Sequence, residues 1–360
     1  FLVEALQKNL TYLAKNGSKP VILLEPSGIQ QVGEHYTAVV GGQVIADELD
    51  YEVVVKQDRW KVPEPQPNML LEFMEFMKNA PAPVLLTAAF VATSMVRSII
   101  LESAIDFQGL LYVSGPQGVG KTTLAKKLAG FVKNPETNRE ALFFDSSSTV
   151  AAIRDAMASA RDLPIIIDDL CLSAGKNLQK KRMELGAQIV REASNAACFT
   201  KKSRDGSAIE LSCNAGVIVT AEFVLHNQSD VTRCIMAKVS DPLHLPDALN
   251  AQLAAGAMCN FLYAFVTYVP EAVKRLREMV AEGNAVSALA ECEEQRVRTN
   301  LLVLRWAFHE LIEALAVLHY TRLFADELKQ RFDEALAESV EETQCALEAV
   351  RSNIQEGNLA

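Results

Sequence analysis

The chain has 360 residues, of which 49% are hydrophobic and 22% are charged, and its formal net charge is −10. This composition is typical of a folded globular protein rather than a disordered one, and the length allows two or three domains. The negative charge argues against a protein coated with cations for nonspecific binding to nucleic acid. One stretch is nevertheless basic, because residues 174–204 contain eight Lys or Arg and only two acids.

The seven cysteines include no Cys-x-x-Cys pair, and most lie in apolar runs. This pattern predicts buried thiols in a reducing cytoplasm rather than disulfides or a zinc site. The most apolar run, residues 83–100, contains Arg97 and several hydroxyl side chains, so we expect a packed helix and no membrane span. No signal peptide is visible. The first residue is Phe1 rather than Met, and we therefore expect a fragment that lacks flanking domains.

The N-terminal third divides into a β-rich part and a helical part. A short helix is predicted over residues 2–13, and alternating apolar and polar positions around several glycines predict β-structure over 20–57. Three prolines at alternate positions in residues 62–68 exclude a helix and mark a linker. Two helices are expected next, over 69–78 and 84–103.

From residue 110 onward, apolar runs with the length of strands alternate with helical segments. This alternation predicts a parallel sheet covered by helices on both faces, the α/β class. The predicted elements are strand 110–114, helix 122–132, strand 142–144, helix 149–161, strand 163–168, strand 216–220 and strand 234–239. After residue 247 nearly everything is expected to be helical. We therefore divide the chain into a β-rich module (1–62), a linker with helices (63–108), a P-loop core (109–246) and a helical C-terminal domain (247–360).

The strand at 110–114 runs directly into the sequence Gly115-Pro116-Gln117-Gly118-Val119-Gly120-Lys121-Thr122-Thr123. This segment, called here the phosphate loop, matches G-x-x-x-x-G-K-T and is followed by a helix-forming run. Its glycines allow successive backbone N–H groups and a helix N-terminus to converge on a triphosphate. Lys121 is expected to reach the β- and γ-phosphates of ATP, and the Thr122 hydroxyl to ligate Mg²⁺.

Two carboxylates follow the apolar strand at 163–168. Asp168 and Asp169 come at the end of that strand, where ligands bind in open parallel sheets. We expect Asp168 to hold Mg²⁺ through water and Asp169 to polarise the attacking water. The plainer alternative is an acidic turn. At the tip of the next core strand, Thr220 is placed to orient that water or to contact the γ-phosphate, the alternative being an ordinary strand-end threonine.

The order phosphate loop, Asp168-Asp169, Thr220 and Arg233 resembles an AAA+-type ATPase module over about residues 80–245. The stretch 198–211 is similar to the hairpin that superfamily-three and MCM-like helicases use to grip DNA in the pore of a hexameric ring. The combination also resembles an uncharacterised ATPase domain of phage and mobile-element replication proteins. The resemblance implies a ring of copies in which Arg233 reaches the neighbouring subunit's site. A surface arginine at a strand entry is the alternative for Arg233.

The hairpin also has a physical basis in the sequence. Asp205-Gly206 is a favoured tight-turn dipeptide, and Lys201, Lys202 and Arg204 cluster beside it. These cations are candidates for contact with DNA phosphates. No aromatic residues alternate with them, which favours contact with the backbone over base stacking. A solvated hairpin without DNA is the alternative.

The leading interpretation is a cytoplasmic, hexameric ATPase that uses ATP and Mg²⁺ to move on single-stranded or forked DNA, as the replicative helicase of a phage or mobile element. Three other classes are alternatives. A small-molecule phosphoryl transferase usually carries an arginine-rich lid over the acceptor, and the basic stretch at 174–204 is not obviously such a lid. An ABC-type ATPase needs an LSGGQ-like signature, and Leu172-Ser173-Ala174-Gly175 is too short and wrongly placed for one. A regulatory ATPase that acts on protein partners stays open. Six cations are candidates for a lid residue: Lys274, Arg275, Arg277, Arg296, Arg298 and Arg305.

Overall fold

The computed structural model describes residues 21–25, 27–45, 52–55, 60–63, 69–145, 147–170, 176–194, 199–202, 208–223, 225–283, 286–290, 292–318 and 324–355. The helix predicted over residues 2–13 and most of the proline-rich linker lie outside these ranges.

A five-stranded sheet forms the centre of the molecule. Its strands are β6 (Leu110–Ser114), β7 (Phe143–Phe144), β8 (Pro164–Leu170), β11 (Gly216–Ala221) and β12 (Cys234–Lys238). They run in the order β12-β6-β11-β8-β7, and every neighbouring pair is parallel. All residues of β6 and β11 are buried, as expected for apolar strands covered on both faces. The predicted parallel α/β sheet is therefore confirmed.

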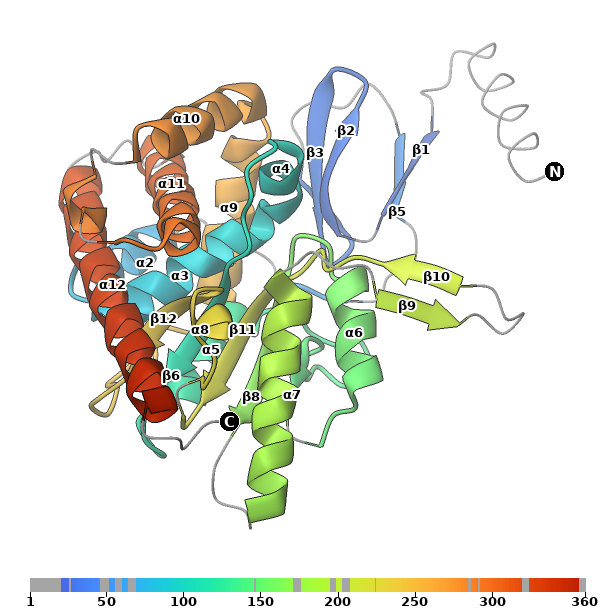
Figure 1. The fold of residues 1–360 in the computed structure, drawn as a ribbon. Helices are drawn as coiled ribbons and strands as arrows, with labels where there is room; N and C mark the ends of the chain where they lie inside the picture. The colour runs from blue at the N-terminus through green and yellow to red at the C-terminus, as the bar shows by residue number, and fades with distance from the viewer. Residues whose placement is uncertain are drawn as a thin grey trace, which may run out of the picture.

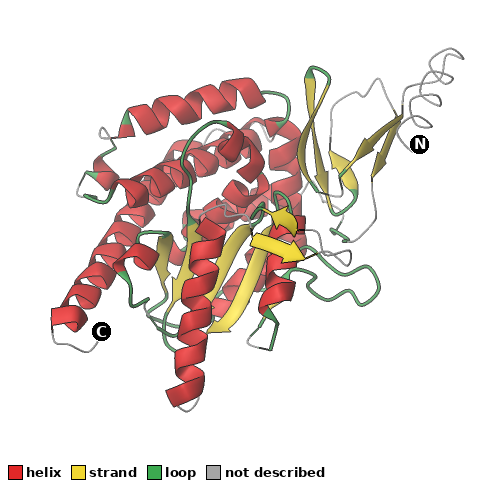
Figure 2. Cartoon of the chain, turned by 45° about the vertical axis from the view of Figure 1, so that its right-hand side comes forward, coloured by secondary structure: helices red, strands yellow, loops and turns green. Residues whose placement is uncertain are grey.

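Helices cover both faces of this sheet (Figures 1 and 2). They are α2 (Met69–Lys78), α3 (Ala82–Met95), α4 (Arg97–Glu102), α5 (Lys121–Ala129), α6 (Val150–Ser159), α7 (Lys176–Ser194) and α8 (Gln228–Val231). The C-terminal part adds α9 (Ala251–Phe265), α10 (Val269–Ala281), the short 3₁₀ helix η2 (Ser287–Leu289), α11 (Gln295–Leu318) and α12 (Ala325–Gln355). Figure 2 shows α7 in front of the sheet. The C-terminal part is helical, as expected.

The single helix predicted over 84–103 is two helices, α3 and α4, that meet at Val96 (φ −121°, ψ 18°). The hydroxyls of Thr93 and Ser94 donate to the carbonyls four residues earlier, at Ala89 and Phe90. Hydroxyl groups that bond to the preceding turn in this way commonly bend a helix. The apolar pattern continues across the break, which explains why the sequence alone predicts one element.

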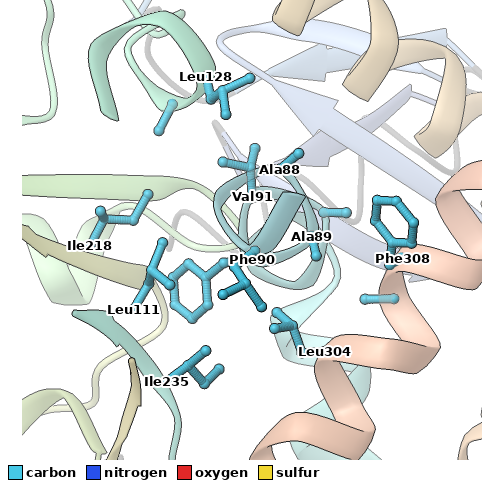
Figure 3. Packing of buried hydrophobic residues seen from close by; sticks show 14 of the residues in the cluster. Ala88, Ala89, Phe90, Val91, Leu111, Leu128, Ile218, Ile235, Leu304 and Phe308 are labelled. Carbon is cyan, nitrogen blue, oxygen red and sulfur yellow. The ribbon is translucent and has the colours of Figure 1, made fainter. Parts of the chain in front are cut away.

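Helix α3 is completely buried. Figure 3 shows it packed between Leu111, Ile218 and Ile235 of the sheet and Leu304 and Phe308 of α11. The apolar segment at 83–100 is therefore buried in the core, as predicted, although it forms α3 and part of α4 rather than one helix. Among the described residues no single helix is long and apolar enough to cross a membrane, and one bent pair, α9 with α10 at 98°, passes that test on length and composition together.

The N-terminal part forms two small sheets. Strands β2 (Gly28–Val32), β3 (His35–Val40) and β4 (Gln43–Ile45) make an antiparallel meander, and β1 (Val21–Leu24) pairs in parallel with β5 (Glu52–Val55). The meander is attached to the core by Asp162. The Asp162 carboxylate accepts hydrogen bonds from the Ile29 N–H (2.9 Å) and from both the N–H and the hydroxyl of Ser98 (2.6 Å each).

A separate two-stranded hairpin projects from the body of the molecule (Figure 1). Its strands are β9 (Phe199–Lys202) and β10 (Ala208–Leu211), which pair in antiparallel register. The hairpin predicted for residues 198–211 is therefore present. The turn between its strands, residues 203–207, lies outside the described part of the chain.

Candidate nucleotide site

The phosphate loop connects β6 to α5 at the carboxyl edge of the sheet. Gly118 and Gly120 have φ values of +81° and +95°, which side chains other than glycine rarely adopt. A Cβ atom at Gly115 would lie 2.1 Å from the Val239 carbonyl oxygen, so this position has no room for a side chain. Helix α5 begins at Lys121, immediately after the loop. The sequence thus forms an open backbone turn that ends on a helix N-terminus, an arrangement suited to anions.

The Lys121 side chain lies over this loop. Its ammonium group donates hydrogen bonds to the carbonyl oxygens of Gly115 (2.8 Å) and Pro116 (2.6 Å), and the residue is only 8% exposed. The cation is therefore held beside the space that the loop encloses, where the β- and γ-phosphates of a bound nucleotide would lie.

Three oxygen-bearing side chains meet beside the loop. The hydroxyls of Thr122 and Thr220 both donate to Asp168 Oδ1, at 2.7 and 2.5 Å. Asp168 and Thr220 lie on the neighbouring parallel strands β8 and β11, whose carboxyl ends share one edge. The structure therefore brings Lys121, Thr122, Asp168 and Thr220 together. Asp169 follows Asp168 in β8, and its side chain lies outside what the structure describes.

This donor set fits a magnesium ion. Mg²⁺ prefers oxygen ligands and is commonly bound by one or two protein oxygens together with water and substrate phosphates. The Thr122 hydroxyl and the Asp168 carboxylate are such oxygens and are already within hydrogen-bond distance of each other. Within the described ranges no group of three or more His, Cys, Asp or Glu side chains has the geometry of an all-protein metal site. A metal here would therefore depend on the nucleotide for part of its coordination.

A cavity of about 550 Å³ lies next to the phosphate loop. Two segments far apart in sequence line it, the junction of α2 and α3 (residues 75–81) and the segment after β12 (residues 241–245). The second segment is tied to the loop because the Leu243 N–H donates to the Val119 carbonyl (3.0 Å). Sequence reasoning missed this cavity, since neither segment carries a motif. A larger cavity of about 720 Å³, between α7 and residues 223–227, includes none of the predicted site residues.

Arg233 does not join this group. It precedes β12, whose first residue pairs with Leu110 and whose last pairs with Ser114, so Arg233 lies at the opposite edge of the sheet from the phosphate loop. Five strand residues span about 16 Å. Its guanidinium donates to the backbone carbonyl and the hydroxyl of Ser229. Arg233 is therefore not placed to act on a nucleotide bound to its own chain.

Two of the three predicted DNA-contacting residues lie in the projecting hairpin. Lys201 and Lys202 belong to β9, in register with Ile209 and Ala208. Their side chains, and the whole of Arg204, lie outside the described residues.

We expect Thr220→Val to keep nucleotide binding but to lower ATP turnover about 10- to 100-fold, the equivalent of one hydrogen bond to a charged group. Valine has nearly the same shape, and it removes the hydroxyl that orients Asp168. Steady-state kinetics and nucleotide titration measure the two effects separately. Thr93→Val, which removes an equally buried hydroxyl inside α3, serves as the control. Equal turnover in the two variants would show that Thr220 is only a core residue.

No protein-family model matches the chain, and a search of curated proteins returns no match. Among solved structures, one titled "SCCmec type IV Cch - active helicase" matches with a TM-score of 0.61 and 18% identity, over 98% of this chain and 67% of that one. At this identity the likeness concerns the fold alone. A structure of the JCV helicase matches with a TM-score of 0.27 and 10% identity over 81% of this chain and 73% of that one, a likeness too low to carry an argument.

Proposed function

We propose that this protein is an ATPase of the helicase type that hydrolyses ATP with Mg²⁺ in a ring of copies and acts on DNA. The observation that carries the proposal is the meeting of Lys121, Thr122, Asp168 and Thr220 at the carboxyl edge of a parallel sheet, beside a glycine loop and a helix N-terminus. In open parallel sheets this edge is where ligands bind. The fold shared with a solved helicase supports the same reading.

Each side chain has a specific task in this proposal. Lys121 exchanges the carbonyls of Gly115 and Pro116 for the β- and γ-phosphate oxygens, and the loop N–H groups surround the phosphates. Thr122, and Asp168 through water, would hold a magnesium ion, which would offset the charge of the phosphates. Thr220 fixes the Asp168 carboxylate. Asp169, next in the strand, polarises the attacking water.

The cavity beside the loop accommodates the rest of the nucleotide. Its volume of about 550 Å³ lies within the range of small-molecule sites. The Ala80 and Phe76 side chains provide apolar surface for a base, and residues 241–245 connect this surface to the phosphate loop. We therefore assign the cavity to the base and sugar of ATP.

The proposed DNA contact rests on the projecting hairpin. The hairpin of β9 and β10 projects from the body of the molecule (Figure 1), and its sequence contains three cations, Lys201, Lys202 and Arg204. A hairpin of this kind in the centre of a ring would track the phosphate backbone. Because phosphate contacts release counterions, binding should weaken steeply with salt. In its most specific form, the proposal is that the protein acts as the replicative helicase of a phage or mobile element.

The experiment is ATP hydrolysis with and without single-stranded DNA. We expect DNA to stimulate the wild type and to have no effect on the variant in which Lys201, Lys202 and Arg204 are alanine, with basal turnover kept. The log–log slope of DNA binding against salt should also fall by roughly three at most.

The matched control replaces three exposed cations elsewhere, Lys61, Arg139 and Arg351, with alanine. This variant should keep both the stimulation and the slope. If the hairpin variant behaves like this control, the DNA proposal is wrong and a regulatory ATPase acting on protein partners becomes the better account. No ATP hydrolysis by the wild type would contradict the proposed function as a whole.

A further inference from the structure

Three arginines from separate elements converge at the edge of the sheet opposite the phosphate loop. Arg191 comes from α7, Arg233 from the turn before β12 and Arg296 from the first turn of α11. Arg296 reaches this turn directly, since its guanidinium donates to the Thr232 hydroxyl at 3.5 Å. The sequence analysis gives a role across the subunit boundary only to Arg233, and leaves Arg296, 63 residues later in the chain, as one of six candidates for a lid cation.

The cluster carries more positive than negative charge. Asp230, which is 1% exposed, is its central carboxylate, and Arg191 binds both oxygens of that carboxylate at 2.9 and 3.0 Å. Within the described part of the chain no carboxylate lies at ion-pair distance from Arg296. The nearby Glu294 accepts a hydrogen bond from Gln228 instead. The guanidinium of Arg296 is therefore not neutralised by a described carboxylate.

The pKa of Arg233 also indicates an excess of positive charge in this cluster. Burial lowers the pKa of Arg233 from its ordinary value, the guanidinium of Arg296 lowers it further, and Asp230 partly opposes both effects. A cation placed near other cations and partly removed from water is stabilised when an anion binds. Such sites are frequent where proteins bind phosphates.

The turn at residues 227–233 determines which way the cluster of Arg191, Arg233 and Arg296 faces. The Arg233 N–H donates to the Asp230 carbonyl (3.2 Å), and the Asn227 amide donates to the Asp230 carboxylate (3.1 Å). The Arg191–Asp230 pair therefore holds the turn on which Arg233 and Thr232 stand. Because this turn and the phosphate loop lie at opposite ends of β6 and β12, the cation site faces away from its own nucleotide.

We infer that Arg296 acts with Arg233 as a second cation that contacts the terminal phosphate of ATP held by a neighbouring copy, with the Arg191–Asp230 pair as the positioning element. The inference rests on the proposed function, because it needs a nucleotide and a ring. It adds a residue from the helical C-terminal part to the ATPase site of the next subunit. Head-to-tail contacts of this kind close into rings and place two different surfaces at each interface.

The first test compares Arg296→Ala with wild type in steady-state turnover, in binding of a non-hydrolysable ATP analogue and in trapping of ADP with aluminium fluoride. We expect turnover to fall about 10- to 100-fold and trapping to be lost, while analogue binding changes less than about threefold. Arg296→Lys keeps the charge without the planar fork and should give intermediate turnover. Arg351→Ala, an exposed cation of α12, should behave like wild type.

The second test identifies which chain supplies the phosphate. Arg296→Ala subunits keep their phosphate loop, and Lys121→Ala subunits keep their arginines, so mixed assemblies contain some complete sites. We expect them to recover activity that neither variant has alone. No recovery, in assemblies shown to be mixed, would mean that Arg296 acts on its own chain or on free phosphate and would overturn the inference.

Different results would contradict the inference about Arg296 and the proposed function. If the wild type hydrolyses ATP and the Arg296→Ala variant matches Arg351→Ala in turnover and trapping, the inference alone is overturned. A wild type without hydrolysis overturns the proposed function, and the inference fails with it. Thermal unfolding of Arg296→Ala at the wild-type temperature would exclude loss of fold as the cause of reduced turnover.

Discussion

The Lys121→Ala variant is expected to lose ATP hydrolysis completely and to bind nucleotide much more weakly than the wild type. The ammonium group is the only cation that the described residues place inside the phosphate loop, where it bonds to Gly115 and Pro116. Without it, the loop itself would offer the phosphate charges only backbone dipoles. A hydrogen bond between charged groups contributes about twice as much as one between neutral groups. Steady-state hydrolysis and titration with labelled ATP measure the two losses.

Lys126→Ala is the matched control, since Lys126 is in the same helix and its ammonium lies over the Phe143 ring, 4.0 Å from its centre. We expect this control to bind and hydrolyse ATP. Circular dichroism should show both variants folded, because the two carbonyls that Lys121 leaves can bond to water. Turnover near the wild-type level in Lys121→Ala would falsify the assignment of the phosphate loop.

The Asp162→Ala variant is expected to lose about 3–5 kcal/mol of unfolding free energy. Three buried donors, two on Ser98 and one on Ile29, lose their acceptor, and each buried unsatisfied group costs about 1–3 kcal/mol. Asp162 also has φ +55°, a conformation that aspartate and asparagine adopt more readily than alanine. Thermal or urea unfolding measures the loss, and an Asp162→Ala transition that coincides with that of the wild type would contradict it.

Asp162→Asn removes the charge and keeps one acceptor oxygen, while its amide nitrogen can no longer accept a hydrogen bond. Burial raises the pKa of Asp162 from its ordinary value, against the hydrogen bonds from Ser98 and Ile29 that lower it. A raised folded pKa means that the contribution of Asp162 to stability is full below its unfolded pKa of about 3.9 and is lost as the pH rises through the folded pKa. Asparagine is neutral throughout. We therefore expect Asp162→Asn, which keeps part of the hydrogen bonding, to be less destabilised than Asp162→Ala and to gain on the wild type as the pH rises through that window.

The sheet and the phosphate side of the site could be predicted because their signals are local. Apolar runs of strand length and a loop rich in glycine are contained in adjacent residues, and the parallel order then places Asp168 and Thr220 at the same edge as Lys121. Patterns in consecutive residues were therefore enough to predict the strands of the sheet and the phosphate loop. The roles of these residues stay predictions until the variants are measured.

The features that the sequence did not predict depend on contacts between distant segments. The cavity beside the loop needs residues 75–81 and 241–245 to meet, and Arg296 reaches Thr232 only because α11 packs beside the sheet. The break at Val96 was missed for a different reason. It depends on how the Thr93 and Ser94 hydroxyls are used, while the apolar pattern on which the helix prediction rested continues unchanged.

The position of Arg233, at the end of β12 farthest from the phosphate loop, gives the ATPase site proposed here a dependence on mass action. If Arg233 and Arg296 complete the site of a neighbouring copy, as proposed, one folded chain does not contain a whole ATPase site. Dilute, isolated copies would hold ATP without consuming it, and turnover per copy would rise with local abundance. ATP hydrolysis would therefore begin only above the concentration at which copies assemble. Because the phosphate loop and the arginines lie at opposite edges of one sheet, assembly would set a threshold for ATPase activity.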